Sequence, residues 1–349
     1  MKLFNLLFII SMGIFASLVA SCENSDIEFP DYEGGTTVYF ASQYPVRTIV
    51  LGEDDTFDTS LDNQHRCEIY ATIGGAYKNT EKVTIGIEVD KMLCNNLYFD
   101  EGKTEPVRLM PDNYYTLSGN QIVLDHDKWG AITVQLTDAF FADENALKNT
   151  YVIPVVMTNV DGADHILTGT PLIEGDSPLR TNSAYWNVQP KDYVLYCLKF
   201  INPWHASYLR RGIDVVTENG TAKDIVRHNV SVEKDEISYL TTLGLKTTAF
   251  SFTTKMDDGR TLECGLLLTF NDNNECTITA NSYGCRANGT GKFIKDGEKK
   301  SWGNKDRNAL YLNYEIDFGN GIQCVTKDTL VVHSRGVVGE WFTPTYNGN

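Results

Sequence analysis

Hydrophobic and polar residues alternate in short runs along most of the chain, a pattern that predicts strands rather than helices. Up to residue 158 the runs are separated by turn residues, at the spacing typical of a β-sandwich. Only residues 90–96 and 137–148 carry a helical pattern. We therefore expect an Ig-like β-sandwich whose strands are residues 36–41, 46–51, 66–72, 82–89, 121–124, 132–136 and 151–158.

The alternation returns after residue 190 and continues almost to the end of the chain. Links such as Asp257-Asp258-Gly259 and Gly319-Asn320-Gly321 are hairpin turns, because Asn, Asp and Gly tolerate the positive φ of a tight reversal. Consecutive hairpins of about eight strands predict an antiparallel β-barrel, which leaves no exposed edge and can enclose a small ligand. The predicted strands are residues 192–201, 213–217, 224–232, 245–256, 261–270, 276–281, 310–318 and 322–332.

The N-terminus carries the pattern of a secretion signal. After Lys2, an apolar run ends in Val19-Ala20-Ser21-Cys22, in which small residues suit the signal peptidase and the cysteine thiol accepts lipid. Two alternatives are a transmembrane anchor, since about 18 apolar residues almost span a bilayer, and an ordinary signal whose cysteine is incidental. We interpret residues 1–21 as a lipoprotein signal peptide, Cys22 as the lipidation site and residues 22–33 as the lipidated tether, which anchors the protein in the outer membrane.

The length of the mature chain favours two domains. Removing 21 residues from 349 leaves 328, more than one hydrophobic core usually holds. Residues 170–190 are rich in Pro, Gly and small polar residues and therefore indicate a linker. We expect an all-β protein with the sandwich in residues 34–180 and the barrel in residues 181–349.

Charge and cysteine content restrict the partners and the covalent framework. The chain has 46 acidic and 30 basic residues, a net charge of -16, which argues against nucleic acid or anionic lipid headgroups as partners. Seven cysteines besides Cys22 are an odd number, so at least one thiol stays free. Most of them, Cys197 and Cys264 included, lie in alternating apolar runs, where cysteine packs as a small hydrophobe. We expect few or no disulfides.

Signatures of catalysis are absent from the sequence. It contains no Gly-x-Ser-x-Gly, no His-Glu-x-x-His and no phosphate-binding glycine loop before a helix. The six histidines are scattered without the spacing of a metal site, so we expect neither a metal nor a cofactor. We predict that the protein is not an enzyme. A small glycoside-processing enzyme stays open as an alternative, because the distance between carboxylates in space is invisible in a sequence.

Aromatic residues supply the candidate binding chemistry. The chain has 5 Trp, 18 Tyr and 16 Phe, and such rings bind the apolar face of a pyranose while neighbouring polar groups bind its hydroxyls. Residues 202–211 offer both kinds of group. The alternative is structural, with the tryptophan in the core and the arginines paired with surface carboxylates. The candidate ligand-binding residues are Trp204, His205, Tyr208, Arg210, Arg211 and Trp341.

Local motifs in the first half resemble a module found in Bacteroidetes surface lipoproteins. They are Leu136-Thr137-Asp138-Ala139-Phe140-Phe141-Ala142-Asp143 followed by Tyr151-Val152-Ile153-Pro154, Met110-Pro111-x-x-Tyr114-Tyr115, and Gly74-Gly75-x-Tyr77. The second half, with Pro190-Lys191-Asp192-Tyr193 and Asn202-x-Trp204-His205, resembles the partner domain that follows this module, which is similar in outline to lipocalin or calycin barrels. The acidic residues 23–28 resemble a surface-export signal, with a plain linker as the alternative.

The resemblance implies a non-catalytic lipoprotein of a polysaccharide-utilisation locus. Such a protein holds oligosaccharide or polysaccharide at the cell surface for an outer-membrane importer complex, and it touches the membrane only through its lipid anchor. The resemblance implies no catalytic residues. A second hypothesis is a structural or adhesive surface lipoprotein that makes protein contacts, for which a large exposed apolar patch is the distinguishing feature.

Overall fold

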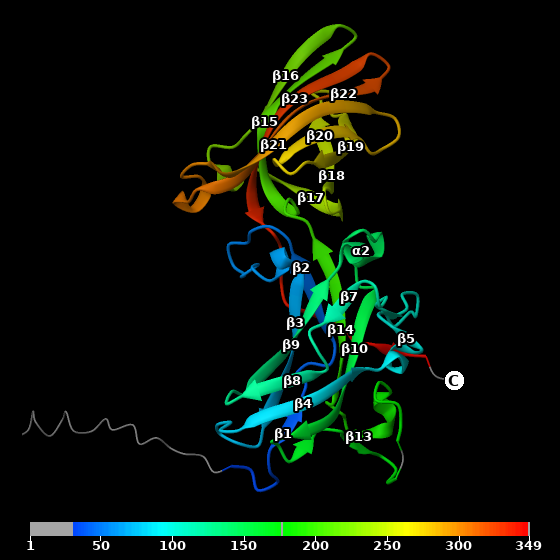
Figure 1. The fold of residues 1–349 in the computed structure, drawn as a ribbon. Helices are drawn as coiled ribbons and strands as arrows, with labels where there is room; N and C mark the ends of the chain where they lie inside the picture. The colour runs from blue at the N-terminus through cyan, green and yellow to red at the C-terminus, as the bar shows by residue number, and fades with distance from the viewer. Residues whose placement is uncertain (1–30, 176, 348–349) are drawn as a thin grey trace, which may run out of the picture.

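The computed structural model describes residues 31–175 and 177–347 as two β-rich units stacked end to end (Figure 1). The N-terminal unit is sandwich-like and the C-terminal unit is a closed antiparallel barrel, so the predicted all-β fold is confirmed. The signal peptide, Cys22 and most of the tether lie outside the described residues. Within the described ranges, no helix combines the length and the apolar character that a membrane crossing requires.

The N-terminal unit is built from two facing sheets. The first has the strand order β11 (His165–Ile166), β1 (Thr37–Tyr39), β3 (Arg66–Gly74), β9 (Trp129–Leu136) and β7 (Tyr115–Leu117). The second has the order β24 (Glu340–Trp341), β2 (Pro45–Val50), β14 (Tyr193–Ile201), β10 (Tyr151–Asp161), β4 (Lys82–Val89) and β8 (Gln121–Asp125), with β6 (Arg108–Leu109) beside β10. Apolar side chains from both sheets fill the space between them.

Short elements complete the two units. The helical pattern at 137–148 corresponds to α2 (Asp138–Phe141) and the 3-10 helix η3 (Glu144–Leu147), and that at 90–96 to η2 (Lys91–Cys94). Two ribbons pair β12 (Thr170–Pro171) with β13 (Trp186–Val188) and β5 (Leu97–Tyr98) with β25 (Thr345–Tyr346). The remaining 3-10 helices are η1 (Asp62–Gln64), η4 (Ser183–Tyr185), η5 (Val232–Lys234) and η6 (Trp302–Asn304).

Strand β14 moves the domain boundary away from the predicted position. It pairs with β10 on one side and with β2 on the other, so it belongs to the N-terminal unit. Successive residues such as Val194 and Leu195 contribute to cores on opposite faces of the sheet, which explains why nearly the whole strand is apolar. The barrel therefore begins after Ile201, not at residue 181, and residues 170–190 are a loop of the first unit. The chain also returns to this unit after the barrel, where β24 pairs with β2.

The barrel is a meander closed by its first strand. Strands β17 to β23 pair in sequence order, and β15 pairs with both β17 and β23, which closes eight strands into a ring. Strand β16 forms a hairpin with the outer half of β15. The bounds are β15 (Ala206–Glu218), β16 (Thr221–Arg227), β17 (Glu236–Gly244), β18 (Thr247–Lys255), β19 (Thr261–Phe270), β20 (Glu275–Ala280), β21 (Arg286–Glu298), β22 (Arg307–Gly319) and β23 (Ile322–Ser334).

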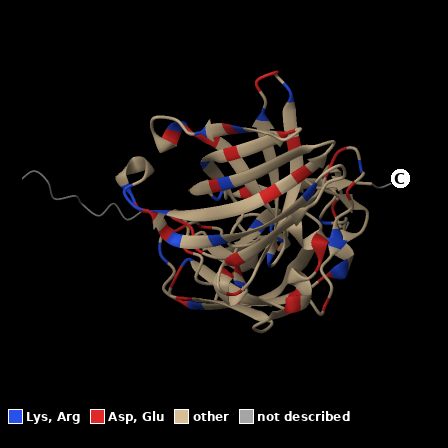
Figure 2. Ribbon diagram, turned by 90° about the horizontal axis from the view of Figure 1, so that it is seen from above, with Lys and Arg blue, Asp and Glu red and all other residues tan. Residues whose placement is uncertain are grey.

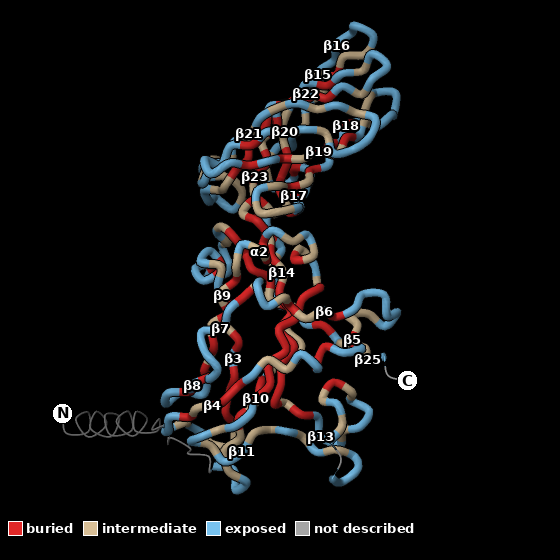
Figure 3. Tube along the Cα trace, turned by 45° about the vertical axis from the view of Figure 1, so that its right-hand side comes forward, coloured by how far each residue is buried: buried red, intermediate tan, exposed pale blue. Residues whose placement is uncertain are grey.

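The barrel interior is packed with apolar side chains, and buried stretches run along its strands as they do in the sandwich (Figure 3). One disulfide, Cys264–Cys285, ties β19 to the loop before β21. Cys264 was expected to pack as a thiol, and its bond corrects that expectation. The other cysteines of the described part are free and buried: Cys67, Cys94, Cys197, Cys276 and Cys324.

Candidate functional site

Two of the aromatic candidates lie in the barrel core. Trp204 is 5% exposed and stacks flat on Phe270, with ring centroids 3.9 Å apart and planes 6° from parallel. Tyr208 is fully buried, and its hydroxyl donates to the carbonyl of Trp204 over 2.7 Å. Neither ring presents a free face to solvent, so neither can stack on a sugar in this conformation.

Arg210 lies inside the barrel in a cluster of buried charges. Its Nε donates to Asp328 over 3.1 Å, and Arg227 bridges Asp328 and Asp214 with bonds of 2.8 and 2.6 Å from its Nη2. Tyr314 donates to Asp328 over 2.7 Å, and burial beside that carboxylate raises the pKa of Tyr314 well above its usual value. The two arginines pair with the two aspartates and with Glu236, which lies 3.0 Å from Arg210 Nη1. This cluster joins strands β15, β16, β22 and β23 and is structural.

His205 belongs to the junction between the two units. Its Nδ1 accepts the backbone N–H of Thr242 over 3.1 Å, and burial together with the charge of Arg335 lowers its pKa to about 4. Arg335 itself is buried and donates to four backbone carbonyls, at 2.6 to 3.1 Å. These carbonyls belong to Leu51, Glu53, Asn202 and His205, so Arg335 joins the loop after β2 to the segment that enters the barrel. The Asn202-x-Trp204-His205 motif therefore positions the barrel on the sandwich.

The other two candidates are accessible but lie apart. Trp341 is 68% exposed on β24, at the edge of the sandwich sheet. Arg211 is half-buried on the outside of the barrel, with its Nε 2.6 Å from Asp235, and its strand partner on β23 is Thr329. Of the six candidates, only Arg211 has a strand partner, Thr329, that lines the hollow in the barrel wall described next.

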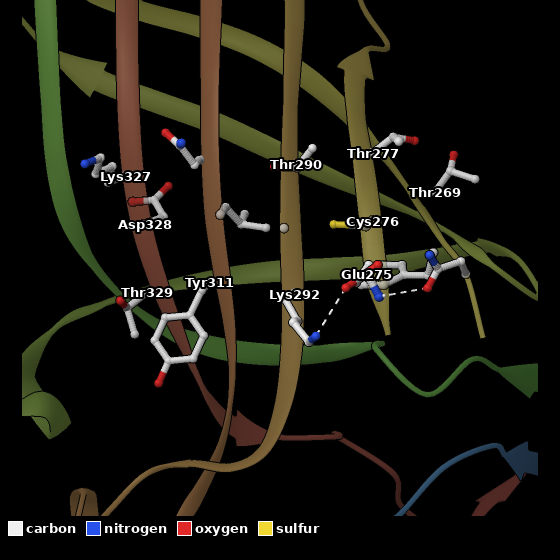
Figure 4. A pocket seen from close by; sticks show the side chains of 15 residues that line it. Thr269, Glu275, Cys276, Thr277, Thr290, Lys292, Tyr311, Lys327, Asp328 and Thr329 are labelled. Carbon is white, nitrogen blue, oxygen red and sulfur yellow. Dashed lines mark hydrogen bonds and ion pairs between the residues drawn. The ribbon is translucent and has the colours of Figure 1, made fainter. Parts of the chain in front are cut away.

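That hollow is a groove of about 930 Å³ on the outer face of β19 to β23, which we call the outer groove (Figure 4). Two rows of outward side chains cross these strands. Strand pairing places the first row in the order Thr269, Thr277, Thr290, Asn313 and Lys327. The second row has the order Glu275, Lys292, Tyr311 and Thr329 and then reaches Arg211. At about 4.8 Å between strands, the first row is about 19 Å long.

The floor of the outer groove is shaped by Gly291. A Cβ at this position would lie 2.4 Å from Leu312 Cδ2 and 2.8 Å from Cys276 Sγ, so two interior side chains fill the space behind the glycine. Gly291 therefore leaves room for Leu312 and Cys276 to pack against the barrel wall from the inside, between the two rows of outward side chains.

Polar and aromatic groups of the outer groove are held in defined positions. Lys292 points toward Glu275, with Nζ 3.2 Å from its Oε1, and this bond lowers the pKa of the Glu275 carboxyl (Figure 4). Tyr311 donates its hydroxyl to Glu298 over 2.8 Å. Burial and the Glu298 carboxylate raise the pKa of Tyr311 to about 12, so its hydroxyl stays protonated at neutral pH. The groove thus combines one fixed ring with hydroxyl, amide and ammonium groups, which is the chemistry of a polar, extended ligand.

A second hollow of about 600 Å³ lies at the junction of the units. Two ion pairs cross it, Lys295 with Glu53 at 2.6 Å and Arg307 with Asp55 at 2.9 Å. The face of Trp302 is covered by the Arg307 guanidinium, 3.4 Å from the ring centroid. Because two ion pairs cross it and the face of its tryptophan is covered, this junction hollow is a weaker candidate. Among the described residues, no three His, Cys, Asp or Glu side chains gather as a metal site requires.

Comparison with solved structures assigns the family. A Bacteroides ovatus protein, described as a structural genomics protein of unknown function, is 44% identical to this chain, with a TM-score of 0.84. The match covers 91% of this chain and 100% of that one. The chain belongs to the same family. Two family models match parts of this chain: a domain of unknown function (DUF5627) matches residues 203–336, and a model described as an N-terminal domain matches residues 32–164.

More distant structures show little similarity. A multidomain protein including DUF1735, also from Bacteroides ovatus, is 11% identical with a TM-score of 0.39, and covers 88% of this chain and 99% of its own. The ywiB protein of Bacillus subtilis is 9% identical with a TM-score of 0.20, over 37% of this chain and 94% of its own. No curated protein matches the chain.

The sequence held only a faint signal for the outer groove. Its side chains come from strands separated by up to 60 positions in the chain, from Thr269 to Thr329, and threonines on an alternating strand usually indicate a solvated face. The useful signal is the glycine-rich run around Gly289 and Gly291 in a strand with alternating polar residues. Glycine inside a strand often marks a place where another group approaches the backbone.

Proposed function

We propose that this family member is a non-catalytic, lipid-anchored protein of the outer cell surface that binds glycan chains in the outer groove and presents them to an importer. The observation that carries the proposal is the outer groove itself. Its two rows of hydrogen-bonding side chains cross five adjacent strands and are open at the surface, with Tyr311 among them. A polysaccharide laid across the strands would meet a new polar side chain at each strand.

The physical case rests on the match between sugar chemistry and the groove. Sugar hydroxyls need donors and acceptors at the rim, which the threonines, Asn313 and Lys292 supply. The apolar ring face needs an aromatic partner, and Tyr311 is held by its bond to Glu298. An open surface of this kind buries little of its ligand, so binding through single sites is expected to be weak.

Replacing Tyr311 with alanine tests the groove as the glycan site. We expect about a five- to tenfold loss of affinity for any glycan that wild-type protein binds, because the ring contributes stacking as well as buried area. The measurement is affinity electrophoresis of the mature chain against a panel of plant and host polysaccharides, followed by calorimetry. The control is Tyr239→Ala, which removes an exposed tyrosine on β17. Equal affinity of both variants and wild type would place the site elsewhere.

The anchor is the second part of the proposal. Cys22 follows the lipobox Val19-Ala20-Ser21, and stable attachment takes more than one acyl chain. Radiolabelled palmitate is expected to enter the protein in a bacterial host, and Cys22→Ala is expected to abolish both labelling and retention in the envelope fraction. Cys67→Ala, which removes a buried thiol, should leave labelling unchanged. If the wild-type protein incorporates no palmitate, the lipid anchor is refuted, and the proposal that the outer groove binds glycan is unaffected.

Protein adhesion is a second candidate function, and one observation favours it. Ile213, Val226 and Val325 are each about half exposed on the outer part of the barrel, with Ile213 directly opposite Val226. If folded protein is retarded by no glycan at all, this apolar strip becomes the better candidate surface.

A further inference from the structure

We infer that the outer groove selects glycans that carry carboxylate or sulfate groups, and that the Lys327 ammonium group binds the negative charge. This inference rests on the proposed function and names the class of sugar chain that the groove takes. Its starting point is Lys327, the one charged side chain of the groove that is not paired with an opposite charge in the described part of the chain.

The balance follows from the four charged residues that line the groove: Glu275, Lys292, Lys327 and Asp328. The Asp328 carboxylate is turned into the barrel, where Arg210 and Arg227 neutralise it. Lys292 and Glu275 pair with each other. Among the described residues, Lys327 is thus the one lining residue whose charge has no ion-pair partner, and it offers a free ammonium group to the open groove.

Lys327 is exposed and has no ion-pair partner within residues 31–175 and 177–347. Its neighbours across the strands are the neutral Asn313 on β22 and Ile213 on β15. Glu315 is two positions along β22 from Asn313, yet it forms no ion pair with this lysine among the described side chains. Figure 2 shows acidic and basic residues scattered over the strands and loops of the molecule.

Position adds to the argument. Lys327 stands at one end of the first row, after three threonines and Asn313, and Arg211 stands at the same side of the second row. A glycan that follows the rows would bring one sugar unit against this end. An acidic unit gains a charge-assisted hydrogen bond from the ammonium group, whereas a neutral unit gains only an ordinary one.

The test uses two matched pairs of polymers in affinity electrophoresis at low salt. Polygalacturonate is compared with its fully methyl-esterified form, and dextran sulfate with dextran, so that charge changes while each backbone is kept. The protein is strongly acidic, and general electrostatics therefore oppose retention by the anionic polymers. We expect retardation by at least one anionic member and weaker retardation by its neutral partner, with the two pairs distinguishing carboxylate from sulfate.

Variants then assign the effect to the residue. Lys327→Gln is expected to weaken binding of the anionic polymer about fivefold, the upper range for an exposed charge pair, and to reduce its salt dependence. Lys327→Arg should keep binding. Lys255→Gln, which removes an exposed lysine on β18, should change nothing.

Each other result has a definite meaning. Equal binding of charged and neutral partners, with Tyr311→Ala still reducing both, overturns this inference and leaves the proposed function standing. Equal loss in Lys327→Gln and Lys255→Gln also overturns it, because the charge effect is then general. If folded protein binds none of these polymers and none of the wider panel, the proposed function fails and the inference fails with it.

Discussion

Replacing Arg210 with methionine is expected to lower the free energy of unfolding of the barrel by about 3–5 kcal/mol, the cost of removing one partner from a buried ion pair. The guanidinium is fully buried and bonds to Asp328, to Glu236 at 3.0 Å and to the Thr253 carbonyl at 3.2 Å. Methionine fills much of the space but leaves two aspartates facing only Arg227. The measurement is urea unfolding followed by tryptophan fluorescence, in which both the midpoint and the slope are compared.

An exposed arginine of the same barrel provides the control. Arg260→Met breaks pairs with Glu218 and Asp258, and all three side chains are at least one third exposed, so the substitution is expected to cost no more than about 1 kcal/mol. The two arginine substitutions should therefore differ severalfold in effect. If Arg210→Met and Arg260→Met unfold at the same urea concentration, the interior cluster does not stabilise the barrel as its geometry indicates.

The fold was predictable where apolar alternation marks the strands, and the exceptions have physical causes. Strand β21 was missed because its inward positions include Gly289 and Gly291. Tyr314 occupies the space beside Gly289, and Leu312 and Cys276 occupy the space beside Gly291. Strand β17 was missed because its outward positions, Ile237 and Tyr239, are apolar although exposed. In a small barrel, neighbouring strands share the filling of the interior, so one strand alone need not show the pattern.

The structure separates the predicted site residues for a related reason. Trp204, His205 and Arg210 combine aromatic and polar chemistry in one short segment. Such a combination is typical both of a ligand-binding surface and of a buried, hydrogen-bonded position, and the sequence does not distinguish the two. Here the environment is the junction and the barrel core, where polar groups must be paired because they are buried. The outer groove consists of common residues on separate strands, and only the register of the sheet brings them together. Of the residues named from the sequence, only Arg211 has a strand partner that lines it.

Arg335 offers the sharpest test of how the two units are joined. Arg335→Ala removes the donor for four backbone carbonyls, and we expect a loss of about 2–4 kcal/mol, since buried acceptors left without donors carry a desolvation cost. Because the contacts span both units, calorimetry should resolve two unfolding transitions in the variant where wild type gives one. The control is Lys295→Ala, which breaks an exposed pair across the same junction and should cost less than about 1 kcal/mol.

The same variant has a second readout in acid, through His205. The folded pKa of His205 is about 4 against 6.5 for the free side chain, so the folded state binds fewer protons than the unfolded state. Its contribution to stability is complete above pH 6.5 and is lost as the pH falls toward 4, by at most about 1.4 kcal/mol for each pH unit. Arg335→Ala removes one cause of the low pKa, the charge of Arg335, so the variant should lose less stability than wild type over this window. If both proteins lose stability in parallel below pH 6.5 and each unfolds in one transition, Arg335 is not the residue that couples the barrel to the sandwich.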